Sequence, residues 1–206
     1  MSDSSDPTDT TDTTDSTEID VVELYVEALA AFGNAVRDVA DHEWDLPTPA
    51  TEWNVQQIVA HVVLGEAQLP SVLRGETTST QTSFSVDMLG NSPLAAWRGT
   101  ALKAIEAARA DGVADQMFEL DMGTLPGRQL LGYRITDNAV HAWDISVAVG
   151  RPEPIAETTA AWLLDFWQPM ASQIAEIEFF MVPTTPVSLT ASDRLLALLG
   201  RTPPPT

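Results

Sequence analysis

The sequence contains no cysteine, and this absence excludes disulfide bonds, a thiolate nucleophile and any cysteine-ligated metal. A metal ion would therefore need nitrogen and oxygen ligands. Histidine is scarce as well, with three residues in the chain, His42, His61 and His141. Any site that uses imidazole nitrogen must draw on these three, so their positions are informative.

Lysine is nearly absent: Lys103 is the only one, beside nine arginines. Thirty acidic residues oppose these ten basic ones, and the formal net charge is −20 at pH 7. A protein that binds nucleic acid or an anionic membrane surface needs a basic patch, and the sequence shows none. We therefore expect neither kind of partner. Adaptation to high salt and a GC-rich genome that favours arginine both explain this composition, and the sequence leaves the choice open.

Long apolar runs are also missing. No stretch approaches the roughly 18–20 residues that span a bilayer, and the acidic N-terminus lacks the basic and apolar regions of a secretory signal. These features predict a cytoplasmic protein. Its 206 residues, 44% of them hydrophobic, are enough for one domain with an apolar core.

Residues 1–17 read MSDSSDPTDTTDTTDST, with an aspartate at every third position from Asp3 to Asp15. After Met1 the segment has no apolar residue, so it cannot bury enough surface to offset its ordering entropy. We predict a disordered acidic tail that acts as a solvating arm rather than as a partner-binding segment. Without its five aspartates the net charge changes from −20 to −15, so the remaining chain is acidic too.

The rest of the chain alternates between amphipathic stretches and helix breakers. Apolar residues at helical spacing predict helices over residues 19–41, 51–75, 93–110, 130–149, 155–177 and 192–199. Thr51 is a plausible N-cap of the second helix, and Pro169 should kink the fifth. Residues 76–91 read as a loop, residues 113–129 as an irregular stretch with weak strand character before a GTLPG turn, and residues 178–189 as room for a short strand.

Four long helices with connections between them are typical of a four-helix bundle. We therefore expect a mainly α fold in which residues 18–178 form a helical metal-binding domain. Residues 179–206 should form a small extension, helical with some strand, that packs on the bundle.

Three polar residues lie on or beside the apolar stripes of the second and fourth helices. His61 follows Ile58 by three positions and precedes Val62, which places it at the edge of the buried face. Asp137 and His141 are four residues apart, so they lie on one helix face within reach of one ion. A carboxylate near a core is costly unless it is paired or bound to a metal.

Two imidazoles and one carboxylate are a familiar ligand set for zinc, nickel or ferrous iron. Three protein ligands leave an open position, as in catalytic zinc sites. The same spacing also fits an aspartate and a histidine that bond only to each other, or a packed histidine, and spacing alone does not decide. His42, beside Asp41 and Glu43, should lie on the surface.

Three sequence segments resemble one known family. TPATEWNVQQIVAHVV, which contains Trp53 and His61, resembles the second-helix motif of the DinB/YfiT-like superfamily. NAVHAWDISVAVG, which contains His141, resembles its mycothiol-dependent maleylpyruvate isomerase branch, and ASDRLLALLGRTP is similar to a C-terminal signature of that branch. The resemblance covers roughly residues 21–203.

The resemblance implies an up-down-down-up four-helix bundle with a metal ion near one end of its core. His61 and His141 match the family's histidine ligands, and Asp137 stands where many members have glutamate. Because aspartate is one methylene shorter, metal affinity and identity depend on it. Asp144 would then be either a partner that orients a histidine, a salt-bridge partner or a solvated acid. Several members use low-molecular-weight thiols as cosubstrates.

From the residues and the resemblance together we predict a site for a divalent metal, zinc first and nickel or iron second, held by His61, Asp137 and His141. The function would be that of a metal-dependent thiol transferase or isomerase, with a thiol and a small molecule as partners. A non-catalytic module that binds a metal or small ligand is the alternative, and a homodimer stays open. Trp53 and Trp143 should be packing anchors. Arg134 should form a surface ion pair. The alternative prediction is that it neutralises a substrate carboxylate.

Overall fold

The computed structural model describes residues 19–79, 82–121, 123–172, 174 and 181–202. The predicted disordered tail, residues 1–17, lies outside the described residues. The described chain is mainly helical, as predicted, with one two-stranded antiparallel sheet. Its elements are α1 (Val21–Arg37), α2 (Val55–Leu73), the 3-10 helix η1 (Val86–Leu89), α3 (Pro93–Ala108), β1 (Met117–Leu120), β2 (Gly123–Pro126), α4 (Gly127–Ala148), α5 (Glu157–Trp167), the 3-10 helix η2 (Gln168–Met170) and α6 (Ala191–Leu198).

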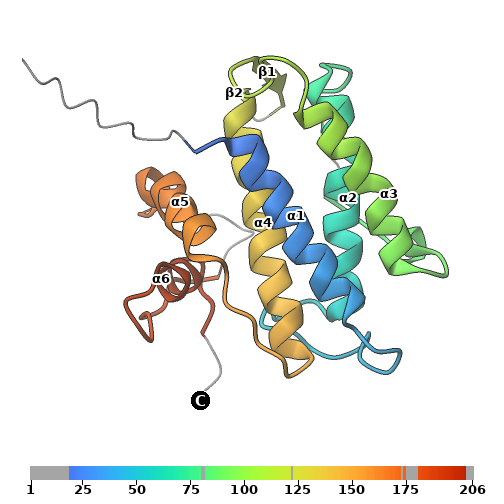
Figure 1. Cartoon of the computed structure of the whole chain (residues 1–206), viewed down its shortest axis with the longest axis vertical. Coiled ribbons are helices and arrows are strands. Elements are labelled where there is room, and N and C mark those ends of the chain that lie inside the picture. Colours follow the sequence, from blue (N-terminus) through green and yellow to red (C-terminus); the bar gives the residue numbers. More distant parts are fainter. Residues whose placement is uncertain (1–18, 80–81, 122, 173, 175–180, 203–206) are drawn as a thin grey trace, which may run out of the picture.

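Helices α1 to α4 form the predicted four-helix bundle. In Figure 1, α1 and α4 run in one direction while α2 and α3 run in the other, which is the up-down-down-up order. α1 packs mainly on α4, and α2 packs mainly on α3. α5 and α6 pack on each other beside the bundle (Figure 1). Within the described part of the chain, no helix combines the length and apolar character needed to cross a membrane.

Helix α4 is the central element, because most of its circumference is buried. Apolar side chains such as Leu131, Ile135 and Ile145 are fully enclosed, but so are the polar side chains of Asn138 and Asp144. A helix that is buried all round has no free polar face, so its polar residues need partners inside the protein. α4 therefore collects the interior polar contacts of the fold.

Several helix ends differ from the sequence prediction. The N-cap of α2 is Asn54 rather than Thr51, because the Asn54 side chain accepts from the Gln57 backbone N–H while the Gln57 side chain accepts from the Asn54 N–H. This reciprocal capping box satisfies two free donors at once. α5 ends at Trp167, and Pro169 continues the chain as the 3-10 turn η2 rather than kinking a longer helix, since proline cannot donate to a helical ladder.

The loops also hold more structure than predicted. The segment predicted as the 76–91 loop contains η1, and the GTLP letters of the predicted turn are strand β2, paired with β1. The short strand predicted within residues 178–189 is absent from residues 181–189, and the rest of that segment lies outside the described residues.

Gly33 allows the close approach of α1 and α3. A Cβ added there would lie 2.2 Å from the ring of Trp97 on α3, far inside van der Waals contact. Gly99 lies on the exposed side of α3, and a Cβ there would meet nothing within 4 Å. The two glycines are therefore a matched pair that separates interhelix packing from helix propensity.

We expect Gly33→Ala to lower the free energy of unfolding by about 1–3 kcal/mol, because the added methyl overpacks the interface. Gly99→Ala should raise it by about 0.5–1 kcal/mol, because alanine favours the helix. Urea unfolding followed by circular dichroism measures both values. Equal effects of the two substitutions would show that the α1–α3 contact is looser than described.

Candidate metal centre

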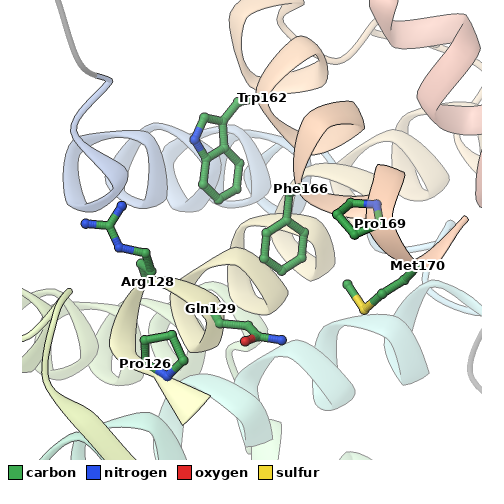
Figure 2. Close-up of a pocket in the computed structure, with 7 residues that line it drawn as sticks. All are labelled: Pro126, Arg128, Gln129, Trp162, Phe166, Pro169 and Met170. Carbon is green, nitrogen blue, oxygen red and sulfur yellow. The ribbon is translucent and has the colours of Figure 1, made fainter.

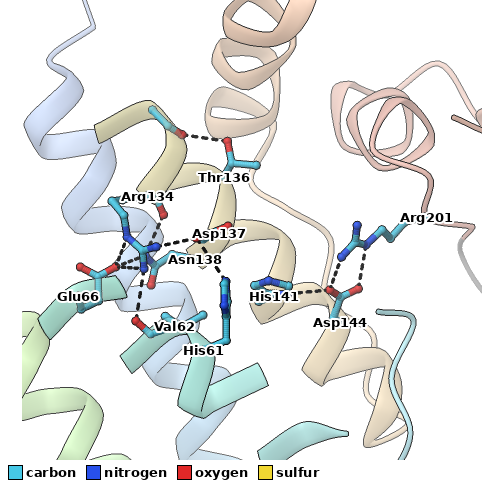
Figure 3. Close-up of polar contacts among 11 residues, drawn as sticks. His61, Val62, Glu66, Arg134, Thr136, Asp137, Asn138, His141, Asp144 and Arg201 are labelled. Atoms are coloured by element: carbon cyan, nitrogen blue, oxygen red, sulfur yellow. Dashed lines mark hydrogen bonds and ion pairs between the residues drawn. The ribbon is translucent and has the colours of Figure 1, made fainter. Parts of the chain in front are cut away.

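The three predicted ligands come together between α2 and α4. One potential ligand atom from each of His61, Asp137 and His141 lies within 4.8 Å of the other two, and His61 Nε2 is 3.6 Å from Asp137 Oδ2. Figure 3 shows the His61 ring standing between the two residues of α4. We call these three side chains the His-Asp-His cluster. Sequence spacing could place two of them on one face, and helix packing supplies the third.

The cluster lies on the wall of a cavity of about 720 Å³ that is partly open to solvent. The side chain of His141 is 8% exposed, and those of His61 and Asp137 are 24% and 32% exposed. The cluster is thus half-buried, with access from the cavity. Such a position keeps the candidate ligand atoms reachable by an ion and a small molecule.

Asp144 orients His141. The Nδ1–H of His141 donates to Asp144 Oδ2 at 2.9 Å, which leaves Nε2 as the ring nitrogen that a metal can use. The same carboxylate receives Arg201 Nη2 at 3.0 Å, and Asp144 is fully buried. Asp144 is therefore at once the orienting partner and a salt-bridge partner, and the reading of it as a solvated acid is wrong. Arg201 was part of a family signature but was not predicted to reach this site.

A second buried ion pair lies behind Asp137. Arg134 Nη2 donates to Glu66 Oε1 at 2.8 Å, and its Nη1 donates to Asp137 Oδ2 at 2.6 Å (Figure 3). The Glu66 side chain is fully buried and also accepts from Asn138 Nδ2 at 2.7 Å and from the Tyr25 hydroxyl. Arg134 does form an ion pair, as predicted, but the prediction that the pair lies on the surface is wrong, because the Arg134 side chain is only 12% exposed.

Gly65 makes room for the Arg134 guanidinium against α2. A Cβ at this position would lie 2.2 Å from Arg134 Nη1, so any larger residue would displace the group that holds Asp137. Glu66 comes next in the sequence and sits four residues after Val62 and three before Leu69, on the apolar stripe of α2. An acid on an apolar stripe is the sequence signal that could have revealed this network.

The surroundings set the charge of the two ligands on α4. Burial opposes ionisation of Asp137, but the Arg134 guanidinium and then His61 hold its pKa well below the ordinary value. Burial lowers the pKa of His141, although Asp144 opposes this effect. At neutral pH the cluster therefore offers an ionised carboxylate and a neutral imidazole, which are the protonation states that bind metals.

Trp53 covers the cluster. Its ring centroid is 4.6 Å from that of His61 and 5.8 Å from that of His141, with Phe84 edge-on at 5.4 Å. Trp53 is a packing residue as predicted, but it packs on the candidate ligands themselves and lines the cavity. Trp143 is a core anchor, 4% exposed. His42 is exposed, as predicted, and takes no part.

The donor set fits a divalent metal of the zinc type. Ligand atoms around a tetrahedral zinc ion lie about 3.4 Å from one another, which is close to the His61–Asp137 separation. The ligand atoms of the cluster lie within 4.8 Å of one another, so side-chain movements of about 1 Å would bring all three to zinc distances. A fixed Nδ1–H bond on His141 is the usual support of a metal-binding histidine. The cavity side of the cluster leaves room for a further ligand.

A second hollow of about 370 Å³ lies elsewhere, among β2, α4, α5 and η2 (Figure 2). Its wall is apolar apart from Arg128 and Gln129, and Arg128 is paired with Asp115 at 2.6 Å. Of its lining residues only Met170 also lines the larger cavity. The described wall of this hollow holds no set of metal-ligating or nucleophilic side chains, so the chemistry is concentrated in the larger cavity.

Comparison with known proteins adds an independent observation. The family described as mycothiol maleylpyruvate isomerase N-terminal domain matches residues 25–146. Uncharacterized proteins from two strains of Mycobacterium tuberculosis are 31% identical over 148 residues, which is 69% of this chain and 78% of theirs. Crystal structures of the mycothiol-dependent maleylpyruvate isomerase and of a point mutant superpose with a TM-score of 0.56, at 17% and 15% identity, over 75% of this chain and 68% of theirs. These structures support the fold.

We expect Asp144→Ala to destabilise the protein by about 3–5 kcal/mol, because it leaves the buried Arg201 guanidinium without a counter-charge. Asp165→Ala on the exposed side of α5 should change stability by less than about 0.5 kcal/mol. Chemical unfolding at pH 7 measures both. A loss of under about 1 kcal/mol for Asp144→Ala would contradict a buried ion pair at this position.

The same pair has a defined pH dependence. Burial opposes ionisation of Asp144, but His141 and Arg201 lower its pKa in the folded protein. Its stabilisation is therefore present above the unfolded pKa of about 3.9 and is lost as the pH falls through the lower folded value. The difference in stability between wild type and Asp144→Ala should shrink as the pH falls below about 4. A difference that keeps growing below about pH 4 would contradict this sign.

Proposed function

This chain belongs to the mycothiol maleylpyruvate isomerase N-terminal domain family, and from that premise we propose that it binds a divalent metal, zinc first, at the His-Asp-His cluster and acts as a metal-dependent thiol transferase or isomerase. The observation that carries the proposal is the cluster itself: two imidazoles and one carboxylate that converge on the wall of a cavity of about 720 Å³. A cluster without an adjoining cavity would suit a structural ion.

Charge supports the same assignment. The ion pairs Glu66–Arg134 and Asp144–Arg201 are each neutral, so Asp137 leaves the interior with one net negative charge when the histidines are neutral. A dication changes this balance to one positive charge, and a bound thiolate would bring it to zero. The site thus suits a divalent ion together with one singly charged anionic ligand.

The chain has no cysteine, so the thiol must come from a cosubstrate. A metal bound here would lower the pKa of that thiol and hold it as the thiolate. Three further side chains support the site: Asp144 orients the ring of His141, Arg134 holds the carboxylate of Asp137, and Trp53 packs on both histidine rings. The thiolate sulfur would form a bond to an electrophilic carbon, and the displaced electron pair would pass to a leaving group or to a conjugated carbonyl oxygen.

The domain boundaries belong to this proposal. Residues 18–178 would form the metal-binding bundle, and residues 179–206 would complete it, because Arg201 reaches Asp144 from beyond α6. A non-catalytic module for a metal or small ligand remains the rival function. It shares the cluster and the cavity but predicts no turnover of a thiol with an electrophile.

We expect one zinc per chain in the purified protein after dialysis, measured by atomic emission. His61→Ala, Asp137→Ala and His141→Ala should each weaken zinc binding at least about 100-fold in competition with a chelator, more than the loss of an outer partner causes. His42→Ala, which changes the exposed histidine, is the matched control and should bind as the wild type does. Stoichiometric zinc in all three cluster variants would refute the metal site.

The thiol is tested with cobalt(II) in place of zinc. Addition of mycothiol should produce a thiolate-to-cobalt charge-transfer band, because the open position accepts sulfur. The band should be absent from His141→Ala and present in His42→Ala. Metal binding without such a band would favour the non-catalytic module, as would a band without any turnover when electrophiles are added.

A further inference from the structure

The cavity has two chemically distinct ends. The His-Asp-His cluster, Arg134 and Arg201 occupy one part of its wall. The rest of the wall is mostly apolar, although Gln68, Thr82, Tyr133 and Thr136 also line it. It draws on α2, β1, α4 and α5, with side chains that include Leu64, Leu69, Val72, Leu120, Leu130 and Trp167. A molecule that reaches the cluster must therefore rest most of its surface on hydrocarbon and aromatic groups.

The two arginines of the wall are already committed to protein groups. Arg134 donates from Nε and Nη2 to Glu66, from Nη2 to the Val62 carbonyl and from Nη1 to Asp137. Arg201 donates from Nε and Nη2 to Asp144 and from Nη1 to the Leu199 carbonyl. Each guanidinium nitrogen thus has an acceptor, and each charge has a carboxylate partner. A substrate carboxylate bound to either arginine would share a guanidinium whose charge a buried acid already balances, so it would bring an uncompensated negative charge into the cavity.

No other cation can take over this role within the chain. The sequence holds ten lysines and arginines, all of them within the described residues, and the other eight do not line the cavity. Glu52 adds a further carboxylate at the wall. The interior carboxylates Asp137, Glu66 and Asp144 face two guanidinium groups, so a dication and one bound thiolate together bring the interior charge to zero. Glu52 is exposed to solvent and contributes a weaker, screened repulsion. A second anion would then meet repulsion as well as desolvation.

We propose that the cosubstrate of the thiol is an uncharged, largely apolar electrophile, with an aromatic ring as the group that fits the apolar end, and not a small dicarboxylate. This inference rests on the proposed function for the position of the reacting carbon at the cluster. The preference for an uncharged molecule follows from the committed arginines and from the apolar wall. The alternative reading of Arg134 as the residue that neutralises a substrate carboxylate does not fit its contacts.

The test compares uncharged and anionic probes of one shape. Methyl 1-naphthoate, 1-naphthoate and maleate are offered in equilibrium dialysis to the full chain loaded with zinc and mycothiol, so that the thiolate already occupies the open metal position. The ester should bind at least about tenfold more tightly than the carboxylate, because burial of an unpaired carboxylate is costly. Maleate should not bind measurably. A carboxylate that binds as well as the ester, measurable maleate binding, or failure of the ester to bind would each overturn the proposal.

Matched variants test whether the preference for the ester over the carboxylate arises in this cavity. Leu64→Gln, on the apolar wall, should weaken ester binding at least about fivefold, whereas Leu102→Gln, at a 63% exposed position of α3, should not change it. Glu52→Gln should tighten 1-naphthoate binding about twofold, because it removes one repelling charge, and should leave the ester unaffected. An unchanged ester affinity in Leu64→Gln would place the probe outside this cavity and overturn the proposal.

The same probes separate this inference from the proposed function. The ester should bind equally well to metal-free protein, because its ring rests on the apolar wall. If zinc binding fails while the ester preference holds, the metal-dependent function is refuted and the selectivity of the cavity stands. If zinc and thiol bind but the carboxylate is preferred, only the inference about the cosubstrate is overturned.

Discussion

The buried carboxylate of Glu66 is the constraint on which the rest of the site depends. A fully buried acid in the middle of a bundle is tolerated only when its charge is balanced and its oxygens are hydrogen-bonded. Tyr25 from α1 and Arg134 and Asn138 from α4 meet this need, so one side chain on α2 ties three helices together. Because Arg134 must lie where Glu66 can reach it, its remaining nitrogen points to Asp137. The ligand position therefore follows from a requirement of the core.

The Asp144–Arg201 pair plays the corresponding part for His141, the other candidate ligand on α4. Arg201 reaches this pair from beyond α6, and Asp144 uses one carboxylate to satisfy that arginine and to hold His141. Each of the two buried ion pairs thus holds one candidate ligand of α4, Asp137 or His141. The third candidate ligand, His61, comes from α2; its Nε2 lies 3.6 Å from Asp137 Oδ2 and its ring packs on Trp53.

The sequence was sufficient for the fold and for the cluster, but for different reasons. Apolar periodicity located the helices, and the spacing of Asp137 and His141 on the fourth helix placed two candidate ligands on one face. Their meeting with His61 depended on helix packing, which only the family resemblance could supply. Glu66 and Tyr25 were not identified from the sequence as part of a polar network. Apolar periodicity assigns such positions to the core without considering which partners their polar groups need. The observed helix ends differ from the predicted ones where local hydrogen bonds, such as those of the Asn54–Gln57 capping box, outweigh the helix propensity of the residues.

Gly65 on α2 constrains Arg134 on α4, which is far from it in the sequence. Any side chain at position 65 would occupy the space of the Arg134 guanidinium, and without that guanidinium both Glu66 and Asp137 would lose their counter-charge. Substitutions at these four positions are therefore not independent during descent. Among relatives, glycine followed by glutamate on the second helix should be inherited together with the arginine on the fourth, and lineages that lose one should lose the set. Such joint inheritance would mark which members of the family keep this form of the site.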